Sequence, residues 1–169
     1  MKRGLQAVCL AIVLGVPPTG VSAAQPDGTV SSGRVEIVLT NEHRKSLEEI
    51  KKEFAEAGLT NLHVQFIKVG KPPTNIGLGP LVTAERARAA IRMAKKYNRG
   101  VTILLPERLF PAHYVTIASS SFDDTVEYPV GTEQLTELEN PALTTEQFHA
   151  LYRKFTQADQ PPPKKGRVF

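Results

Sequence analysis

Basic side chains recur along one predicted helix, which opens near Thr83, at spacings that place them on a single face. The series is Arg88, Arg92, Lys95 and Arg99, and residues three or four apart are neighbours on a helix surface. A positive stripe of this kind can bind phosphates, anionic lipid head groups or the carboxylates of cell-wall peptides. The alternative is an ordinary solvated helix face, on which the helix dipole favours cations near the carboxyl end.

A second group of polar side chains falls on two predicted strands. Within residues 61–69, His63 and Gln65 alternate with apolar residues and should therefore point away from the core. Tyr114 and Thr116 are expected on the outward face of a later strand for the same reason. If helices cover only one face of the sheet, these side chains form a platform for a glycan or a peptide. The alternative is that the C-terminal helix covers this face.

The residue types of a hydrolase triad occur at His113 and in the turn 119–124, which holds three serines and two aspartates. No glycines flank the serines as they do in a nucleophile elbow, and the turn reads equally well as side chains that cap backbone groups. The four histidines show no spacing typical of a zinc site. We therefore expect no metal and no cofactor, and we favour a non-catalytic protein over an unrecognised hydrolase.

The first 23 residues have the pattern of a cleavable export signal. Lys2 and Arg3 precede an apolar run from Leu5 to Val16, and Val21–Ala23 fits the small-x-small cleavage rule. The run is about a dozen residues, which is short of the ~20 that a membrane-spanning helix needs. We expect cleavage after Ala23, a periplasmic or secreted protein, and no membrane span in the mature chain. The alternative is an uncleaved anchor.

Cleavage would leave residues 24–169, which suffice for one domain with its own core. It would also remove Cys9, the single cysteine, so disulfides and thiol chemistry are excluded from the mature chain. The formal charge of the full chain is +4, and loss of Lys2 and Arg3 leaves the mature chain only mildly basic. We therefore expect no nucleic-acid partner.

The elements that must position these groups alternate between strands and helices. Strands are predicted at 34–40, 61–69, 74–78, 101–105 and 114–118, with a return strand at 126–130. Helices are predicted at 41–58, 83–98 and 144–155, with a helical turn near 135–138. The order predicts an α+β, ferredoxin-like β-α-β-β-α-β sandwich with helices on one face, extended by a C-terminal β-hairpin and helix. Residues 24–33 should be a flexible leader, 34–156 one domain and 157–169 a disordered tail.

Local signals set the predicted helix ends. Asn41 and Thr83 suit N-caps, because their side-chain oxygens can accept a free first-turn N–H. Thr144 and Gln147 have the spacing of a capping box. Gly58 supplies the left-handed residue that ends the first helix.

Three segments of residues 35–105 carry a resemblance to a known family. Ile76–Leu81 (IGLGPL) is similar to a strand ending in Val-Gly-Pro-Phe, and Thr83–Ala87 with Ala90–Ile91 is similar to a following helix with spaced alanines. This arrangement resembles the sporulation-related repeat (SPOR) domain. The resemblance implies a small β-α-β-β-α-β fold that binds peptidoglycan glycan strands. Asn75 and the Arg86–Ala87 pair are also similar to OmpA-like peptidoglycan-binding domains.

Together these features lead us to expect an exported, non-catalytic cell-envelope binding protein with peptidoglycan as its first candidate ligand. The binding residues would lie either on the sheet or on the basic helix: His63, Gln65, Tyr114 and Thr116, or Arg88, Arg92 and Lys95. A first alternative is a soluble accessory subunit that binds another envelope protein through the same sheet or near 70–73. A second is a hydrolase that uses His113 and the 119–124 turn.

Overall fold

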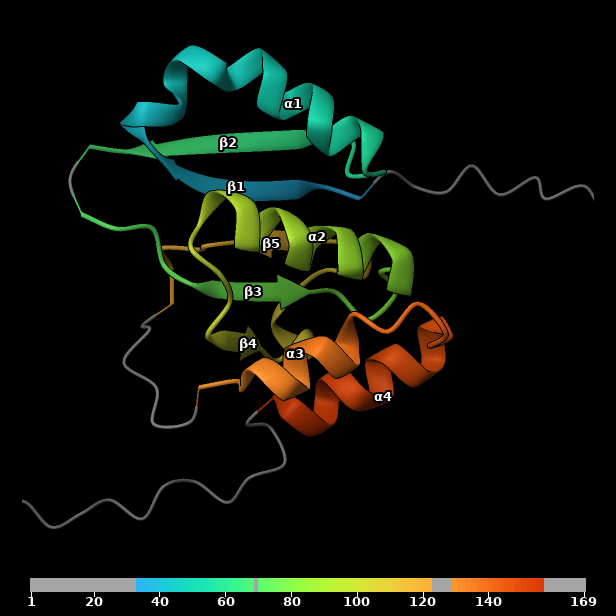
Figure 1. The fold of residues 1–169 in the computed structure, drawn as a ribbon. Helices are drawn as coiled ribbons and strands as arrows, with labels where there is room; N and C mark the ends of the chain where they lie inside the picture. The colour runs from blue at the N-terminus through green and yellow to red at the C-terminus, as the bar shows by residue number, and fades with distance from the viewer. Residues whose placement is uncertain (1–32, 69, 123–128, 157–169) are drawn as a thin grey trace, which may run out of the picture.

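The computed structural model describes residues 33–68, 70–122 and 129–156. These residues form one α+β domain with a five-stranded mixed sheet and four α-helices (Figure 1). The expected signal peptide, the leader up to residue 32 and the expected tail at 157–169 lie outside the described residues, as does most of the predicted return strand at 126–130.

The elements follow the predicted order. The strands are β1 (Val35–Thr40), β2 (Leu62–Ile67), β3 (Asn75–Leu78), β4 (Ile103–Leu105) and β5 (Val115–Ile117). The helices are α1 (Leu47–Glu56), α2 (Ala84–Tyr97), α3 (Thr132–Leu138) and α4 (Thr145–Phe155), with 3-10 helices η1 (Asn41–Ser46) and η2 (Glu107–Leu109). The predicted α+β class and the order β-α-β-β-α-β are confirmed.

The sheet consists of two parallel pairs that a fifth strand joins. Its order is β2-β1-β5-β3-β4. β1 is parallel to β2, and β3 is parallel to β4. β5 lies between the pairs, parallel to β1 and antiparallel to β3, so that Ile37, Ile117 and Ile76 are neighbours in one row. Each pair with its connecting helix is therefore a βαβ unit, and the two units run in opposite directions.

The strand pairing differs from the predicted one in three respects. β1 and β2 are direct neighbours, whereas a split βαβ core places another strand between them. β3 pairs with β4 and β5, not back onto β2. Both edges of β5 are occupied, so β5 does not form the expected C-terminal hairpin with a return strand. Each of these pairings depends on long-range packing, which local sequence patterns do not report.

The core lies between the sheet and the helices. Ile50 and Phe54 of α1, Ile91 of α2, and Phe148 and Tyr152 of α4 are fully or almost fully buried in a single cluster with the inward side chains of the strands. Figure 1 shows α2, α3 and α4 in front of β5, β3 and β4. The alternative in which the C-terminal helix covers the opposite face is therefore wrong. This helix packs against α2 instead.

Most of the predicted helix ends are confirmed. The Thr83 hydroxyl accepts from the N–H of Arg86 at 3.3 Å, and Thr144 with Gln147 forms the capping box. Gly58 has a φ of 77° after α1. Asn41 is not an α-helix cap: it begins η1, and its side chain accepts a hydrogen bond from Arg44.

Aromatic side chains cover the middle of the other face of the sheet. The ring of Phe110 occupies the space that a side chain at Gly77 would fill. It stacks on Tyr114 with centroids 5.8 Å apart and contacts Phe122 at 5.7 Å. Next to it, the N–H of Gly79 donates to the carbonyl of Tyr114 at 2.8 Å, which extends the β3–β5 pairing. The segment that follows η2 therefore folds back over the sheet.

We predict that Gly79→Ala destabilises the domain by about 2 kcal/mol, because overpacking typically costs 1–3 kcal/mol. A Cβ at this position would overlap the backbone carbonyl oxygens of Pro111 and Ala112. Urea unfolding followed by circular dichroism measures the effect. Gly131→Ala is the control, because the nearest atom to its added Cβ is the Gln134 side-chain oxygen at 3.6 Å. Equal midpoints for the two variants would contradict the predicted close approach.

Candidate functional site

The structure does not bring the four predicted sheet residues together on one open surface. His63 and Gln65 lie on the edge strand β2 and are exposed, as the alternation predicts. Thr116 is on the same face of the sheet but is only 3% exposed, and its methyl group lies beside Gly77, where the Phe110 ring packs. Of the predicted binding platform, only the part on β2, with His63 and Gln65, is exposed.

Tyr114 is half-buried and already has a partner. Its hydroxyl donates to the carboxylate of Glu36, which also pairs with Arg34 at 2.5 Å. Burial, followed by this hydrogen bond, raises the pKa of Tyr114 to about 12. Tyr114 therefore fixes the loop over the sheet face, and it remains a neutral donor at physiological pH.

The predicted basic stripe on α2 is divided between internal contacts and solvent. Arg88 donates to the carbonyls of Asn140 and Leu143 at 3.3 and 3.4 Å, which holds the turn between α3 and α4. Lys95 forms an ion pair with Glu139 at the end of α3. Arg92 is exposed. Two of the four cations of the stripe thus fasten the C-terminal helices to α2, and the fourth, Arg99, lies just beyond the end of this helix.

The described residues of the hydrolase hypothesis, His113 and the serines of the 119–124 turn, are not brought together by the fold. His113 precedes β5 and Ser119 follows it, so the two residues lie at opposite ends of this strand. His113 itself faces the carbonyl of Leu81 at 3.1 Å. Asp123 and Asp124 lie outside the described residues. His113 and the serines of this turn therefore do not form a triad.

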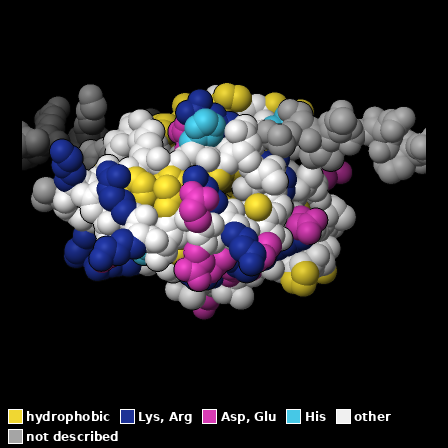
Figure 2. All heavy atoms as spheres, turned by 90° about the horizontal axis from the view of Figure 1, so that it is seen from above, with side chains coloured by type: hydrophobic (Ala, Val, Ile, Leu, Met, Phe, Trp, Pro, Cys, Tyr) yellow, Lys and Arg dark blue, Asp and Glu magenta, His cyan; other side chains and the backbone are white. Residues whose placement is uncertain are grey.

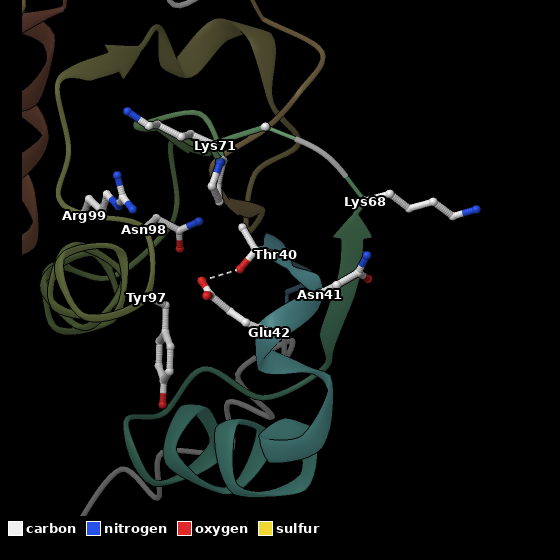
Figure 3. A pocket seen from close by; sticks show the side chains of 10 residues that line it. Thr40, Asn41, Glu42, Lys68, Lys71, Tyr97, Asn98 and Arg99 are labelled. Atoms are coloured by element: carbon white, nitrogen blue, oxygen red, sulfur yellow. Dashed lines mark hydrogen bonds between the residues drawn. The ribbon is translucent and has the colours of Figure 1, made fainter.

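A cavity of about 330 Å³ opens where β1 and β2 end and α2 finishes (Figure 3). It is lined by side chains from three separate segments of the chain. These are Thr40, Asn41 and Glu42 after β1, Lys68, Gly70, Lys71 and Pro72 after β2, and Tyr97, Asn98 and Arg99 at the end of α2. Ligands of open α/β sheets bind outside the carboxyl ends of parallel strands, which is the position of this cavity.

Basic side chains gather at this end of the molecule. Figure 2, which views the domain from above Figure 1, shows Lys and Arg side chains concentrated toward the end where β1 and β2 finish. Lys71 and Arg99 are exposed and stand on one side of the cavity, whereas Lys68 points away from its centre (Figure 3). Within the described part of the chain, none of these three cations takes part in an ion pair. Lys71 and Arg99 are therefore available to an anion.

Asn98 forms part of the cavity wall and leaves a buried acceptor unused. The residue is 2% exposed, and its amide NH₂ donates to the carbonyl of Val38 at 2.7 Å, which ties the end of α2 to β1. Its side-chain oxygen has no hydrogen-bond partner among the described residues. An unsatisfied buried acceptor costs about 1–3 kcal/mol, so this oxygen is a site where a donor would be stabilised.

Arg99 adopts a backbone conformation that its residue type disfavours. Its φ is 62°, a left-handed value that costs a residue with a Cβ about 1–2 kcal/mol. Glycine is the usual residue at such a position after a helix, and Gly100 follows directly, with a φ of 111°. Strained residues of this kind cluster at functional sites. Arg99 thus places its guanidinium beside the cavity from a backbone conformation that lowers the stability of the fold.

A second charged cluster lies in the core beneath α4. His149 faces the Glu107 carboxylate through Nδ1 and the Val82 carbonyl through Nε2, the latter at 2.6 Å. Arg153 donates to the other Glu107 oxygen at 3.1 Å. Because both ring nitrogens face acceptors, the imidazole is held as a doubly protonated cation. It has no lone pair available as a base, so the cluster is a structural link between α4, η2 and the start of α2.

The pKa values in this cluster follow from its contacts. Burial lowers the pKa of His149, but the hydrogen bond to Glu107, the Val82 carbonyl and the Glu107 charge outweigh it and raise the pKa above 6.5. Burial likewise raises the pKa of Glu107, while His149 and Arg153 together bring it below 4.5. Both shifts favour the ion pair at neutral pH.

Comparisons with protein families, curated proteins and solved structures found no match to the chain. The resemblance to SPOR and OmpA-like domains therefore stays a prediction. Among the described residues, no helix is long and apolar enough to cross a membrane, and no three His, Cys, Asp or Glu side chains are grouped to hold a metal ion.

The sequence did not predict the cavity, because its lining residues have the types that commonly end helices and strands or form turns. Thr40 and Asn41 follow a strand, Lys71 lies in a Gly/Pro turn, and Asn98 and Arg99 end a helix. One signal was present: Arg99 takes the place of a helix-terminating glycine although Gly100 stands next to it.

We predict that the ion pair of His149 and Glu107 makes stability depend on pH in a defined direction. The raised pKa of His149 means that its contribution is complete below pH 6.5 and is lost as pH rises through the folded-state value. The lowered pKa of Glu107 means that its contribution is present above pH 4.5 and is lost as pH falls. The cluster should therefore stabilise the fold most between these two values.

Urea unfolding between about pH 5 and pH 9 measures this dependence. In the wild type the free energy of unfolding should decline through the upper part of the range, and in His149→Gln this part of the decline should disappear. His113→Gln is the matched control, since His113 lies at the surface against a carbonyl. An unchanged slope in His149→Gln would show that the imidazole is neutral in the folded protein.

We also predict that Arg99→Gly raises the free energy of unfolding, or leaves it unchanged to within about 1 kcal/mol, because glycine relieves the left-handed strain. Thermal unfolding measures the effect. Arg92→Gly is the control: it places a glycine inside α2 and should lower stability by about 1 kcal/mol. A clear loss of stability in Arg99→Gly would mean that this side chain supports the fold.

Proposed function

We propose that this domain is an exported, non-catalytic binding protein of the cell envelope, and that it holds an anionic group of its ligand in the cavity at the ends of β1 and β2. The observation that carries the proposal is a pair of exposed cations, Lys71 and Arg99, beside a polar cavity. Neither cation has an ion-pair partner among residues 33–68, 70–122 and 129–156. Glu42 is the one acidic residue in the lining. The cavity thus has an excess of positive charge, and it favours carboxylates or phosphates.

The compartment of the protein narrows the choice of ligand. The N-terminal pattern around Lys2, Arg3 and the following apolar run supports export. Outside the cytoplasm, cell-wall peptides are an abundant source of carboxylates. Peptidoglycan is therefore the first candidate, with the peptide part of the polymer as the group recognised. Another envelope protein that presents a carboxylate is the alternative.

The proposal assigns no catalytic step to the domain. The buried cluster of His149 and Glu107 is internally satisfied, and His113 is separated from Ser119 by β5. The cavity offers cations and hydrogen-bond acceptors, which can hold and orient a ligand.

A co-sedimentation assay with purified cell-wall sacculi tests this function. We predict that Lys71→Glu/Arg99→Glu lowers the affinity for sacculi about tenfold or more, because each reversed charge removes an attraction of about 1 kcal/mol and adds a repulsion. Binding should also weaken as salt rises.

The charge-matched control is Lys45→Glu/Arg92→Glu, which changes two exposed cations away from the cavity. If both double variants lost the same affinity for sacculi, binding would depend on the overall charge of the domain and not on the cavity. Absence of binding by the wild type would exclude peptidoglycan and favour a protein partner.

A further inference from the structure

The positive and negative side chains of the cavity lie on different sides, and this separation restricts the chemistry of a ligand. Lys71 and Arg99 stand on one side, and Glu42 stands across from them (Figure 3). Asn98 and Tyr97 lie on the wall contributed by α2. An occupant that carried only negative charge would satisfy the cationic side and leave the acceptor side unmatched.

The acceptor side needs hydrogen-bond donors. The Asn98 side-chain oxygen is buried and has no hydrogen-bond partner in the described part of the chain. Its amide cannot rotate to present the NH₂ group without losing the 2.7 Å bond to Val38. The Glu42 carboxylate accepts a hydrogen bond from the Thr40 hydroxyl at 2.6 Å. The same carboxylate oxygen lies 3.8 Å from Nε2 of His43, and the Glu42 side chain is 75% exposed. In Figure 3 the Asn98 oxygen and the Glu42 carboxylate both turn toward the space between them.

The end of α2 adds to this preference for a positively charged donor. Its last carbonyls point toward the carboxyl end of the helix, where Asn98 and Arg99 follow Tyr97. The helix dipole places a partial negative charge at this end. The ring of Tyr97 is not part of this acceptor side: its hydroxyl donates to Glu53 at 2.5 Å, and the Lys96 ammonium already lies 5.2 Å from the ring centroid.

We propose that the cavity recognises a zwitterionic α-amino-acid head group, with the ammonium between Asn98 and Glu42 and the carboxylate at Lys71 and Arg99. This inference rests on the proposed function, since it names the chemical class of the ligand that the same cavity binds. Free amino acids carry this head group, and so does a cell-wall peptide that contains a diamino dicarboxylic acid whose second amino group is not cross-linked. The two charges of such a ligand match the two sides of the cavity.

The test compares two compounds that differ by an acetyl group on one nitrogen, which removes the positive charge and adds bulk; the Glu42→Gln variant separates these two effects. Alanine and N-acetylalanine are titrated into the ¹⁵N-labelled mature domain, and shifts of the backbone amides of Glu42, Lys71 and Arg99 report binding. We expect alanine to bind about fivefold more tightly, the factor that corresponds to one partly exposed ion pair.

Glu42→Gln separates the ammonium contact from the fold. It keeps an acceptor for Thr40 and changes an exposed side chain, so the domain should remain folded. In this variant the preference for alanine should fall to about twofold or less, as expected when the charge is lost. Lys45→Gln, which changes a charge outside the cavity lining, should retain the preference.

The outcomes distinguish this inference from the proposed function. Equal binding of both compounds by the wild type would overturn the zwitterion and keep an anion-binding cavity. Preference for alanine that survives in Glu42→Gln would overturn the assigned ammonium position. If neither compound shifts the three amides, the head-group inference is overturned, and the sacculus assay with Lys71→Glu/Arg99→Glu decides separately whether the cavity binds the wall.

Discussion

The rest of the domain depends on the pairing of strand β5 with both β1 and β3. Without it, the chain would consist of two separate βαβ units, each with a single pair of strands. β5 pairs with β1 on one side and with β3 on the other, and it aligns Ile37, Ile117 and Ile76 across the sheet. A two-stranded sheet is marginal in water, whereas five strands with one helix-covered face bury a continuous core. The three residues of β5 thus convert two weak units into one domain.

The opposite directions of the two units explain where the cavity forms. In a sheet that is wholly parallel, every crossover helix begins near the carboxyl ends of the strands. Here the second unit is reversed, so α2 ends, rather than begins, at the edge where β1 and β2 finish (Figure 1). Asn98 and Arg99 come to this edge for that reason, beside the residues that follow β1 and β2. The three segments that line the cavity meet because the second unit runs in the opposite direction.

Local patterns in the sequence were sufficient to predict most helices and strands, but not to predict which strands pair. The capping box at Thr144, the alternation at His63 and Gln65, and the alanine face of α2 are all short-range signals, and the structure agrees with each. Thr116 was placed on the correct face, yet it is buried because Phe110, from a loop with no periodicity, covers that part of the sheet. The cavity could not be predicted, because its three segments are brought together only by the reversed second unit.

The late position of β5 in the chain also governs how the domain must assemble. Its partners, β1 and β3, are complete by Leu78, but β5 begins only at Val115. Until then each partner presents an unpaired edge, which is the surface through which strands associate between molecules. Contacts of such long sequence separation slow folding and prolong the exposure of these edges. An unfinished chain therefore lacks the strand that covers both of these edges until its central strand has been synthesised.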